Sequence, residues 1–324
     1  MIYLEQFRFP SVHKEEMCVH DVWNKESSYF HQSIYPFRIL SDAGLNVLDF
    51  DEITILYGGN GSGKSTALNV ISNAIHASRK APYNRTTWFD KYIKLCQYTT
   101  EQHWNGEEFD INGVRSTKFD IADVAHVITS DDIFKSTIET RAKSEQMLQK
   151  SLILADAAIN VKYNPLLDED GNPKLDDRFR RLDFETGENV SEFLNRGKMR
   201  KQSINQYLNG KLGALERGHS NGEMGMMYLA DGITQDGLYI LDEPENSMSS
   251  EFQIKLAEII KYSARYCNSQ FIIATHSPFL LSIPNAKIYN LDAMPAQVDQ
   301  WWNLDCMKLY ANLFEQYREY FITK

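Results

Sequence analysis

Three short, nearly continuous apolar runs interrupt the mixed pattern of the chain, and polar or charged residues follow each of them directly. They are Ile53–Tyr57, Leu238–Leu241 and Phe271–Ala274. Runs of this length that lack strict alternation are typical of strands buried on both faces of a parallel sheet. The pattern therefore predicts three core strands.

Helical spacing follows the first run and separates the other two. After Lys64, apolar residues recur at intervals of three and four, at Ala67, Leu68, Ile71, Ala74 and Ile75. A second apolar face consists of Phe252, Leu256, Ile259 and Ile260. Ser250 and Gln253 have the spacing of a capping box at the start of this second helix. Strand, helix and strand in this order predict a parallel βαβ unit.

The remaining regions differ from one another in pattern. Residues 1–57 and 82–130 predict short, largely antiparallel strands with turns. From Asp132 to about Val161 the spacing becomes helical, and the expected buried positions are Phe134, Ile138, Met147, Leu148, Leu152 and Ile153. Residues 164–177 form an acidic, turn-rich break.

A local excess of basic residues lies in 178–217. Its members are Arg178, Arg180, Arg181, Arg196, Lys198, Arg200, Lys201, Lys211 and Arg217. Charge runs are usually solvated helix faces. This stretch is nevertheless the candidate contact for nucleic acid or an acidic partner.

The first apolar strand leads into a glycine-rich segment with a lysine and two hydroxyl residues. Gly58 is followed after four residues by Gly63, Lys64 and Ser65, which is the spacing of a phosphate-binding loop. The predicted nucleotide-binding residues are Gly58, Gly59, Asn60, Gly61, Ser62, Gly63, Lys64, Ser65 and Thr66. Glycines bring bare N–H groups close to phosphate, Lys64 would reach the β- and γ-phosphates, and Ser65 would hold Mg²⁺. We expect this chain to bind a nucleoside triphosphate.

Two carboxylates follow the second strand. Asp242 would hold Mg²⁺, and Glu243, which points to the opposite face, would orient and deprotonate the attacking water. The third strand ends in Thr275-His276-Ser277. Because this strand should neighbour the Asp242 strand, His276 is predicted to contact the γ-phosphate or the water.

A fourth motif is weaker. Ser220, Asn221, Gly222 and Glu223 open a helical pattern, which would place a hydroxyl and free N–H groups at the positive end of a helix. On its own, the motif fits a capped loop equally well.

Composition narrows the class of protein. The 324 residues are 43% hydrophobic and 24% charged, with a net charge of −10, which argues against uniform coating of nucleic acid. Cys18, Cys96, Cys267 and Cys306 lack metal-ligand or disulfide spacing. The first ten residues contain no apolar signal region, and no run approaches the roughly 18 apolar residues of a membrane span. We expect a cytoplasmic protein without membrane contact.

Together, the order of the P-loop, Ser-Asn-Gly-Glu, strand–Asp-Glu-Pro and Thr-His-Ser-Pro resembles the ABC-type ATPases. The chain is most similar to their soluble "predicted ATPase" branch, which includes the structural-maintenance, recombination-repair and overcoming-lysogenization-defect relatives and small stand-alone bacterial proteins. The resemblance covers residues 1–80 and 215–292. It implies an α/β P-loop NTPase head with a mostly parallel sheet, an N-terminal antiparallel β subdomain and an inserted helical lobe.

This resemblance also implies a mechanism. ATP and Mg²⁺ would bind between two copies of the chain, with Glu243 and His276 catalytic in one copy and residues 220–223 acting on the other copy's site. Residues 245–247 fall in the place of the family's inter-subunit loop. The signature departs from the transporter Ser-Gly-Gly-Gln, and residues 128–134 occupy the place of the glutamine loop. The adenine-stacking aromatic would be Tyr29, Tyr35 or Phe37.

Length limits the role of such an ATPase. A single head spanning residues 1–324, with a lobe at about 132–219, is too short for a long coiled coil or a fused nuclease domain. We therefore expect an ATP-dependent homodimeric switch for a separate effector protein, a nuclease or toxin, with phage defence as one setting. The alternative is a DNA-repair-type ATPase that clamps nucleic acid through residues 178–217.

Overall fold

The computed structural model describes residues 1–25, 33–100, 103–104, 107–108, 120–163, 220–233 and 236–321. The chain divides into two compact units. The first comprises Met1–Ser136 with Ser220–Lys324, and the second comprises Thr137–His219. The division of the chain into one head and a lobe at about 132–219 stays a prediction.

A seven-stranded sheet forms the centre of the first unit. Its strand order is β12-β11-β3-β10-β9-β8-β4, and every described pair is parallel except β11 with β12. The bounds are β12 Gln297–Asp299, β11 Lys287–Asn290, β3 Ile53–Tyr57, β10 Gln270–Ala274, β9 Leu238–Asp242, β8 Ala125–Thr129 and β4 Ser78–Arg79. The predicted mostly parallel core is confirmed.

The three apolar runs are the adjacent strands β3, β10 and β9. Ala274 at the end of β10 is in register with Leu56 on one side and with Asp242 on the other. Because parallel strands run in one direction, their carboxyl ends meet at one edge of the sheet. This register brings the residues after Tyr57, Asp242 and Ala274 together.

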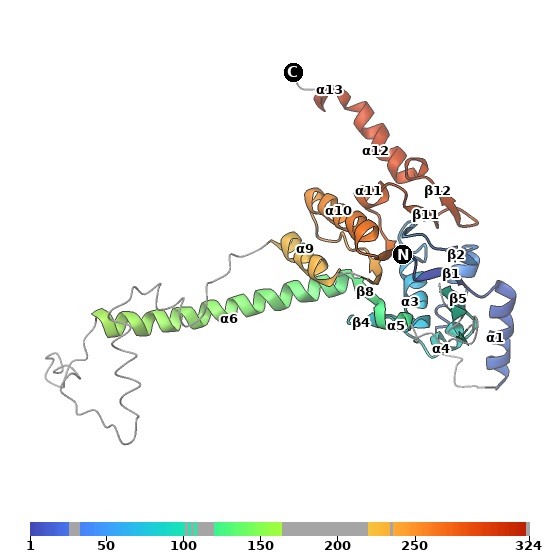
Figure 1. Ribbon diagram of the computed structural model, residues 1–324, viewed down its shortest axis with the longest axis horizontal. Coiled ribbons are helices and arrows are strands. Elements are labelled where there is room, and N and C mark those ends of the chain that lie inside the picture. The colour runs from blue at the N-terminus through green and yellow to red at the C-terminus, as the bar shows by residue number, and fades with distance from the viewer. Residues whose placement is uncertain are drawn as a thin grey trace. The chain divides into compact units, whose positions relative to one another are not determined.

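Alternate residues of these strands face two separate apolar layers. On one face, Leu56, Ile240 and Ile272 pack with α3 (Lys64–Ala74) and the N-terminal strands. On the other face, Ile55 and Leu241 pack with α9 (Asn221–Gly232), α10 (Ser250–Tyr266) and α11 (Pro278–Leu281). Figure 1 shows α9 and α10 on one side of the sheet and α3 on the other.

The predicted N-terminal antiparallel subdomain is confirmed as a second sheet. Its order is β2-β1-β5-β6-β7. The bounds are β2 Val47–Asp49, β1 Leu4–Arg8, β5 Gln97–Thr100, β6 His103–Trp104 and β7 Glu107–Glu108. The buried amide of Gln270 at the start of β10 accepts hydrogen bonds from Tyr3 N (2.8 Å) and Leu4 N (2.9 Å) and so ties the two sheets together.

The expectation that residues 1–57 are mainly strands is wrong in part. The segment contains α1 (Val12–Lys25) and α2 (Ile39–Asp42). Buried Glu15 on α1 accepts hydrogen bonds from Arg38 N (2.7 Å) and Ser41 Oγ (2.9 Å). A polar tertiary contact of this kind leaves no apolar periodicity in the sequence. Residues 82–130 likewise contain α4 (Phe89–Ile93) and α5 (Ile121–Val124) besides strands.

The predicted helix after residue 130 is present as α6 (Ser130–Tyr163). Its expected buried positions Phe134 and Ile138 are instead 61% and 49% exposed. The buried apolar side chain of the first turn is Ile133, whose Cγ2 lies 2.9 Å from where a Cβ on Gly225 would be. The side chains of the four other expected positions, from Met147 to Ile153, and the basic stretch 178–217 lie outside the described residues.

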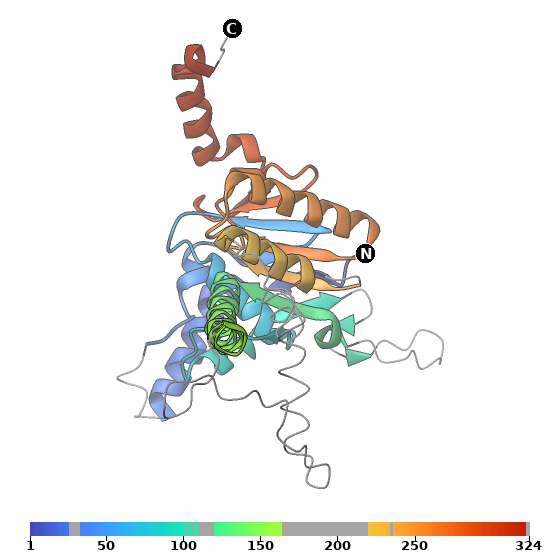
Figure 2. The same cartoon turned by 90° about the vertical axis from the view of Figure 1, so that its left-hand side faces the viewer.

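The C-terminal elements are η3 (Trp301–Asn303), α12 (Asp305–Gln316) and α13 (Arg318–Phe321). No residue of α12 is buried, and Figures 1 and 2 both show this helix projecting away from the sheet. Among the helices that the structure describes, none is both long and apolar enough to cross a membrane.

Candidate active site

The loop between β3 and α3 has the backbone of a phosphate-binding loop. Gly61 and Gly63 have φ of +85° and +96°, a conformation that side-chain-bearing residues rarely adopt. A Cβ on Gly58 would lie 2.5 Å from Ser62 Oγ, so this turn also requires glycine. Ser62 Oγ is buried and has no hydrogen-bond partner within the described ranges. The loop therefore has the tight curvature and the spare polar group that fit a bound phosphate.

Lys64 lies inside this loop with 4% of its surface exposed. Its Nζ donates to Gly58 O (2.8 Å) and Gly59 O (3.2 Å) and is 2.8 Å from His276 Nε2. Burial lowers the pKa of Lys64, and the nearby carboxylates of Glu243 and Asp242 oppose this effect. In this position, the Lys64 ammonium can exchange its carbonyl partners in the loop for the oxygens of a bound phosphate.

Asp292 is a contact of the loop that the sequence patterns did not reveal. Its carboxylate accepts the Gly59 N–H at 2.7 Å (Oδ1) and 2.9 Å (Oδ2). The residue stands two positions beyond the end of β11, which pairs with β3. The sequence signal that could have predicted this contact is the position of Asp292 just after a strand of the same parallel sheet.

Ser65 and Asp242 form the candidate Mg²⁺ pair. Ser65 Oγ donates to Asp242 Oδ1 at 3.0 Å. Burial raises the pKa of Asp242 to about 6, although the Ser65 hydrogen bond and the charges of Arg79 and Lys64 act in the opposite direction. Hydroxyl and carboxylate oxygens suit Mg²⁺, which usually completes its coordination with substrate phosphate and water. No group of three or more metal-binding side chains occurs in the part of the chain that the structure describes.

Glu243 lies opposite Lys64 and His276. Its Oε1 is 3.9 Å from Lys64 Nζ and 3.4 Å from His276 Nε2, and its Oε2 accepts a hydrogen bond from Asn246 Nδ2 at 3.1 Å. The backbone of Glu243 has φ of +47°, which is uncommon for a residue with a side chain. We call Lys64, Ser65, Asp242, Glu243 and His276 the carboxyl-end cluster.

The fourth predicted motif begins α9. Ser220 Oγ accepts the Glu223 N–H (3.2 Å), and Glu223 Oε2 accepts the Ser220 N–H (2.8 Å), which is a complete capping box. Ser220 and Asn221 are exposed. Gly222 is buried, and a Cβ there would lie 3.1 Å from the Phe252 ring. The need for glycine at position 222 thus has an explanation within one chain.

The capping box expected at Ser250 and Gln253 is not formed. The N-cap of α10 is Ser249, one residue earlier, and its side chain makes no capping hydrogen bond. The Gln253 side chain instead donates to Met248 O (3.0 Å) and accepts from Ser277 Oγ (2.8 Å). Gln253 therefore links α10 to the residues after β10.

The segment in the place of the glutamine loop begins at the end of β8. Thr129 is in register with Asp242 on β9. Buried Asp132 accepts hydrogen bonds from Thr129 N (3.0 Å) and Thr129 Oγ1 (2.9 Å). Asp132 thus closes the turn into α6.

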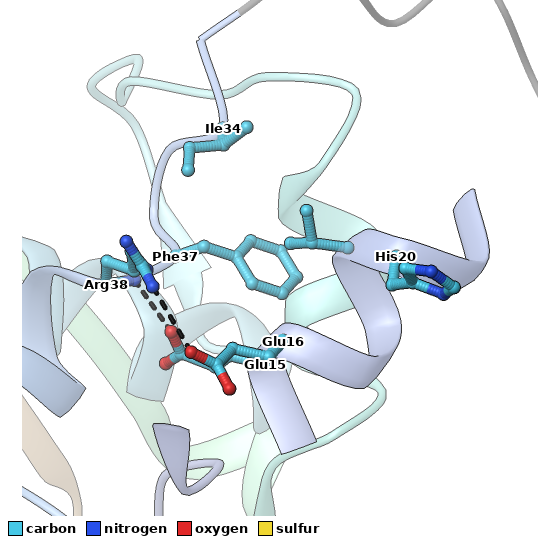
Figure 3. A pocket seen from close by; sticks show the side chains of 7 residues that line it. Glu15, Glu16, His20, Ile34, Phe37 and Arg38 are labelled. Carbon is cyan, nitrogen blue, oxygen red and sulfur yellow. Dashed lines mark hydrogen bonds and ion pairs between the residues drawn. The ribbon is translucent and has the colours of Figure 1, made fainter. Parts of the chain in front are cut away.

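A cavity of about 280 Å³ lies between α1 and the residues before α2. Its lining includes Glu15, Glu16, Phe37 and Arg38, and Figure 3 shows the contacts from Arg38 to both carboxylates. Burial is the largest influence on Glu15 and raises its pKa, against the hydrogen bonds from Arg38 and Ser41.

The aromatic residues considered for adenine stacking have other contacts here. Phe37 is 2% exposed and meets Trp88 and Tyr92 edge-on, so this residue serves the core. Tyr35 stacks on Phe89 with a centroid distance of 6.0 Å. Tyr29 lies outside the described residues.

One family model matches the part of the chain that contains Asp242, Glu243 and His276. Residues 224–282 match the family model described as "AAA domain, putative AbiEii toxin, Type IV TA system". The structure has the predicted α/β architecture, with a mostly parallel sheet and a second, antiparallel sheet. The family match bears out the predicted resemblance to P-loop ATPases over residues 224–282.

Solved structures similar to this chain include an Smc head domain with an extended coiled coil from Pyrococcus furiosus, bound to the C-terminal domain of ScpA. That match has 14% identity and a TM-score of 0.42, and it covers 97% of this chain and 100% of the other. A nucleotide-free ATP-binding cassette from an ABC transporter has 14% identity, a TM-score of 0.38 and coverages of 92% and 90%. No curated protein sequence matches this one.

Proposed function

We propose that this protein binds ATP with Mg²⁺ and hydrolyses ATP to ADP and phosphate. The observation that carries the proposal is the convergence of Lys64, Glu243 and His276 at the phosphate-binding loop. Nζ, Oε1 and Nε2 of these residues lie within 3.9 Å of one another. Such a cluster supplies a cation for the phosphates, a carboxylate base and a ring nitrogen beside it.

Each residue has a role in the proposed reaction. Lys64 exchanges the carbonyls of Gly58 and Gly59 for β- and γ-phosphate oxygens. Glu243 accepts a proton from the attacking water, and the Asn246 amide holds the second oxygen of this carboxylate. His276, whose Nε2 lies 3.4 Å from Glu243 Oε1, contacts the γ-phosphate or the attacking water.

Ser65 and Asp242 would hold Mg²⁺. Held there, the metal would supply positive charge beside the phosphate groups. Asp242 binds a cation in its ionised form, and its raised pKa places the loss of that form near pH 6.

We further propose that ATP joins two copies of the chain. Ser220 at the N-cap and Asn221 at the first position of α9 are exposed, and the helix start offers N–H groups and a positive dipole to a phosphate. Ser220, Asn221, Gly222 and Glu223 of one copy would complete the site that the P-loop of the other copy begins. A dimer that forms with ATP and separates after hydrolysis is a switch, and we propose that it controls a separate effector protein. The matching family is described as a putative toxin of a type IV TA system, and we propose phage defence as the setting of this switch.

Phosphate release by wild type and Glu243→Gln tests the proposed hydrolysis. The glutamine keeps the shape but cannot accept the proton, so we expect kcat to fall about 10²–10⁴-fold while ATP binding remains. Equal turnover by the two proteins would show that the base lies elsewhere.

A further inference from the structure

Glu245 stands two residues after Glu243 and has no role in the reaction described above. Its side chain is buried, and a single oxygen, Oε1, accepts hydrogen bonds from Thr275 Oγ1 (2.6 Å), His276 N (2.8 Å) and Ser277 N (3.2 Å). Hydrogen bonds to an ionised acceptor are about twice as strong as those between neutral groups. Glu245 therefore fastens the turn after β9 to the residues that follow β10.

The residues held by Glu245 carry the His276 ring. Strand β10 ends at Ala274, so His276 lies beyond the sheet ladder. Its ring nitrogen Nε2 must lie 2.8 Å from Lys64 Nζ and 3.4 Å from Glu243 Oε1 to form the cluster. The hydrogen bond from His276 N to Glu245 is thus a direct restraint on where this ring stands.

The second oxygen of Glu245 makes stability alone a poor explanation. Oε2 is buried and has no hydrogen-bond partner within the described part of the chain. Leaving such a buried acceptor unpaired is unfavourable. One oxygen of this buried carboxylate is unpaired while the other binds the backbone of His276. This arrangement favours a role for Glu245 in the site over a purely stabilising one.

We infer that Glu245 is a positioning residue for ATP hydrolysis. It holds the backbone from Thr275 to Ser277 and thereby keeps the His276 ring beside Lys64 and Glu243. The inference rests on the proposed function, because it assigns Glu245 to the same reaction.

Kinetics of Glu245→Ala and Glu245→Gln test the role. A misplaced catalytic group costs up to about 10²-fold, so we expect kcat of Glu245→Ala to fall by about that factor. KM for ATP and the ATP-dependent thermal shift should stay within about twofold, because Glu245 does not touch the P-loop hydrogen bonds of Lys64. Glu245→Gln keeps an Oε1 acceptor, so its kcat should fall by no more than about tenfold. Wild-type kcat in Glu245→Ala would overturn the inference.

A double-mutant cycle with His276→Ala separates positioning from general destabilisation. If Glu245 acts through His276, adding Glu245→Ala to His276→Ala should change kcat by less than about twofold. Independent, multiplying losses would overturn the inference. If Glu245→Ala does not fold, Glu245→Gln takes its place in the cycle, with an expected loss of up to about tenfold in the wild-type background and no added loss beside His276→Ala.

Gln253→Ala is the matched control. This change removes the hydrogen bonds that Gln253 makes with Ser277 Oγ and Met248 O. It leaves the hydrogen bond from His276 N to Glu245 in place. We expect kcat within about threefold of wild type, and a loss as large as that of Glu245→Ala would overturn the specific role.

Histidine ring spectra separate failure of this inference from failure of the proposed function. With ¹⁵N-labelled histidine and no nucleotide, the His276 ring signals, identified by their loss in His276→Ala, should move in Glu245→Ala and stay near their wild-type positions in Gln253→Ala. Absent ATP turnover in wild type would refute the proposed function while this spectrum still reads the positioning. Unmoved His276 signals in Glu245→Ala would overturn the inference.

Discussion

The carboxyl-end cluster and the start of α9 satisfy their polar groups in different ways. In the cluster, side chains from α3, β9 and the residues after β10 bond one another, as in Ser65 with Asp242 and Lys64 with His276. At the start of α9, Ser220 and Glu223 cap each other, and Asn221 is exposed. The cluster is therefore assembled within one chain, whereas the start of α9 is exposed and accessible to a second molecule. This difference is what one half of a shared site requires.

Lys64→Ala should weaken the cluster most. Saturation at about 100 times Kd stabilises a protein by roughly 2.7 kcal/mol, and we expect this variant to lose most of the thermal shift that Mg²⁺–ATP causes in wild type. Lys255→Ala on α10, where Nζ lies over the Phe252 ring, is the control and should keep the shift. An undiminished shift in Lys64→Ala would remove Lys64 from the site.

Asp242→Asn tests how the buried carboxylate of the carboxyl-end cluster affects stability and Mg²⁺ binding. Because burial raises the folded-state pKa of Asp242 from 3.8 to about 6, the folded protein binds this proton more tightly than the unfolded chain does. The associated stability is fully present below pH 3.8 and is lost as pH rises through about 6. Without nucleotide at pH 7.5, Asp242→Asn should thus be more stable than wild type by about 1–3 kcal/mol in denaturant titration, and Mg²⁺ should no longer strengthen ATP binding. A variant less stable than wild type would indicate a structural ion pair instead.

Asn246→Ala should have a smaller effect on the cluster. It removes the hydrogen bond to Glu243 Oε2, so the base is less well oriented. We expect kcat to fall about tenfold at most, or about 1.4 kcal/mol of barrier, with KM for ATP unchanged in steady-state assays. A raised KM with normal kcat would place Asn246 in ATP binding.

Local patterns in the sequence were sufficient to predict the cluster. Each of its residues lies at or shortly after the end of an apolar strand or the glycine loop, and the register of parallel strands then brings them to one edge. Asp292 follows β11 of the same sheet, but the predicted core comprised three other strands, so this residue was not assigned to the site. Glu245 could be placed near the inter-subunit loop, but its hold on His276 depends on side-chain packing.

The errors have equally specific causes. Helix α1 is anchored by the carboxylate of Glu15, which no hydrophobic pattern reports. The buried face of α6 is set by the packing of Ile133 against α9, and this leaves Phe134 outside. The role of Gly222 at a partner's phosphate stays a prediction, but Phe252 of the same chain lies against this glycine, so a bulky residue there would disturb the fold before it tested a dimer.

Asn221 is the better site for probing the shared site, since it is exposed and its side chain does not form the capping box. Asn221→Arg should leave ATP binding to the single chain unchanged and block the approach of a second copy. A mixture of Asn221→Arg with Lys64→Ala should regain turnover, because one intact composite site can form from the two variants.

Light scattering of Glu243→Gln with saturating Mg²⁺–ATP tests the shared site most directly. Slow hydrolysis should trap the ATP-bound form, so the mass should double when ATP is added and should stay that of one chain when Asn221→Arg is also present. A Glu243→Gln protein that remains a single chain with ATP bound, or one that dimerises equally with Asn221→Arg, would contradict a site completed by α9 of a second copy.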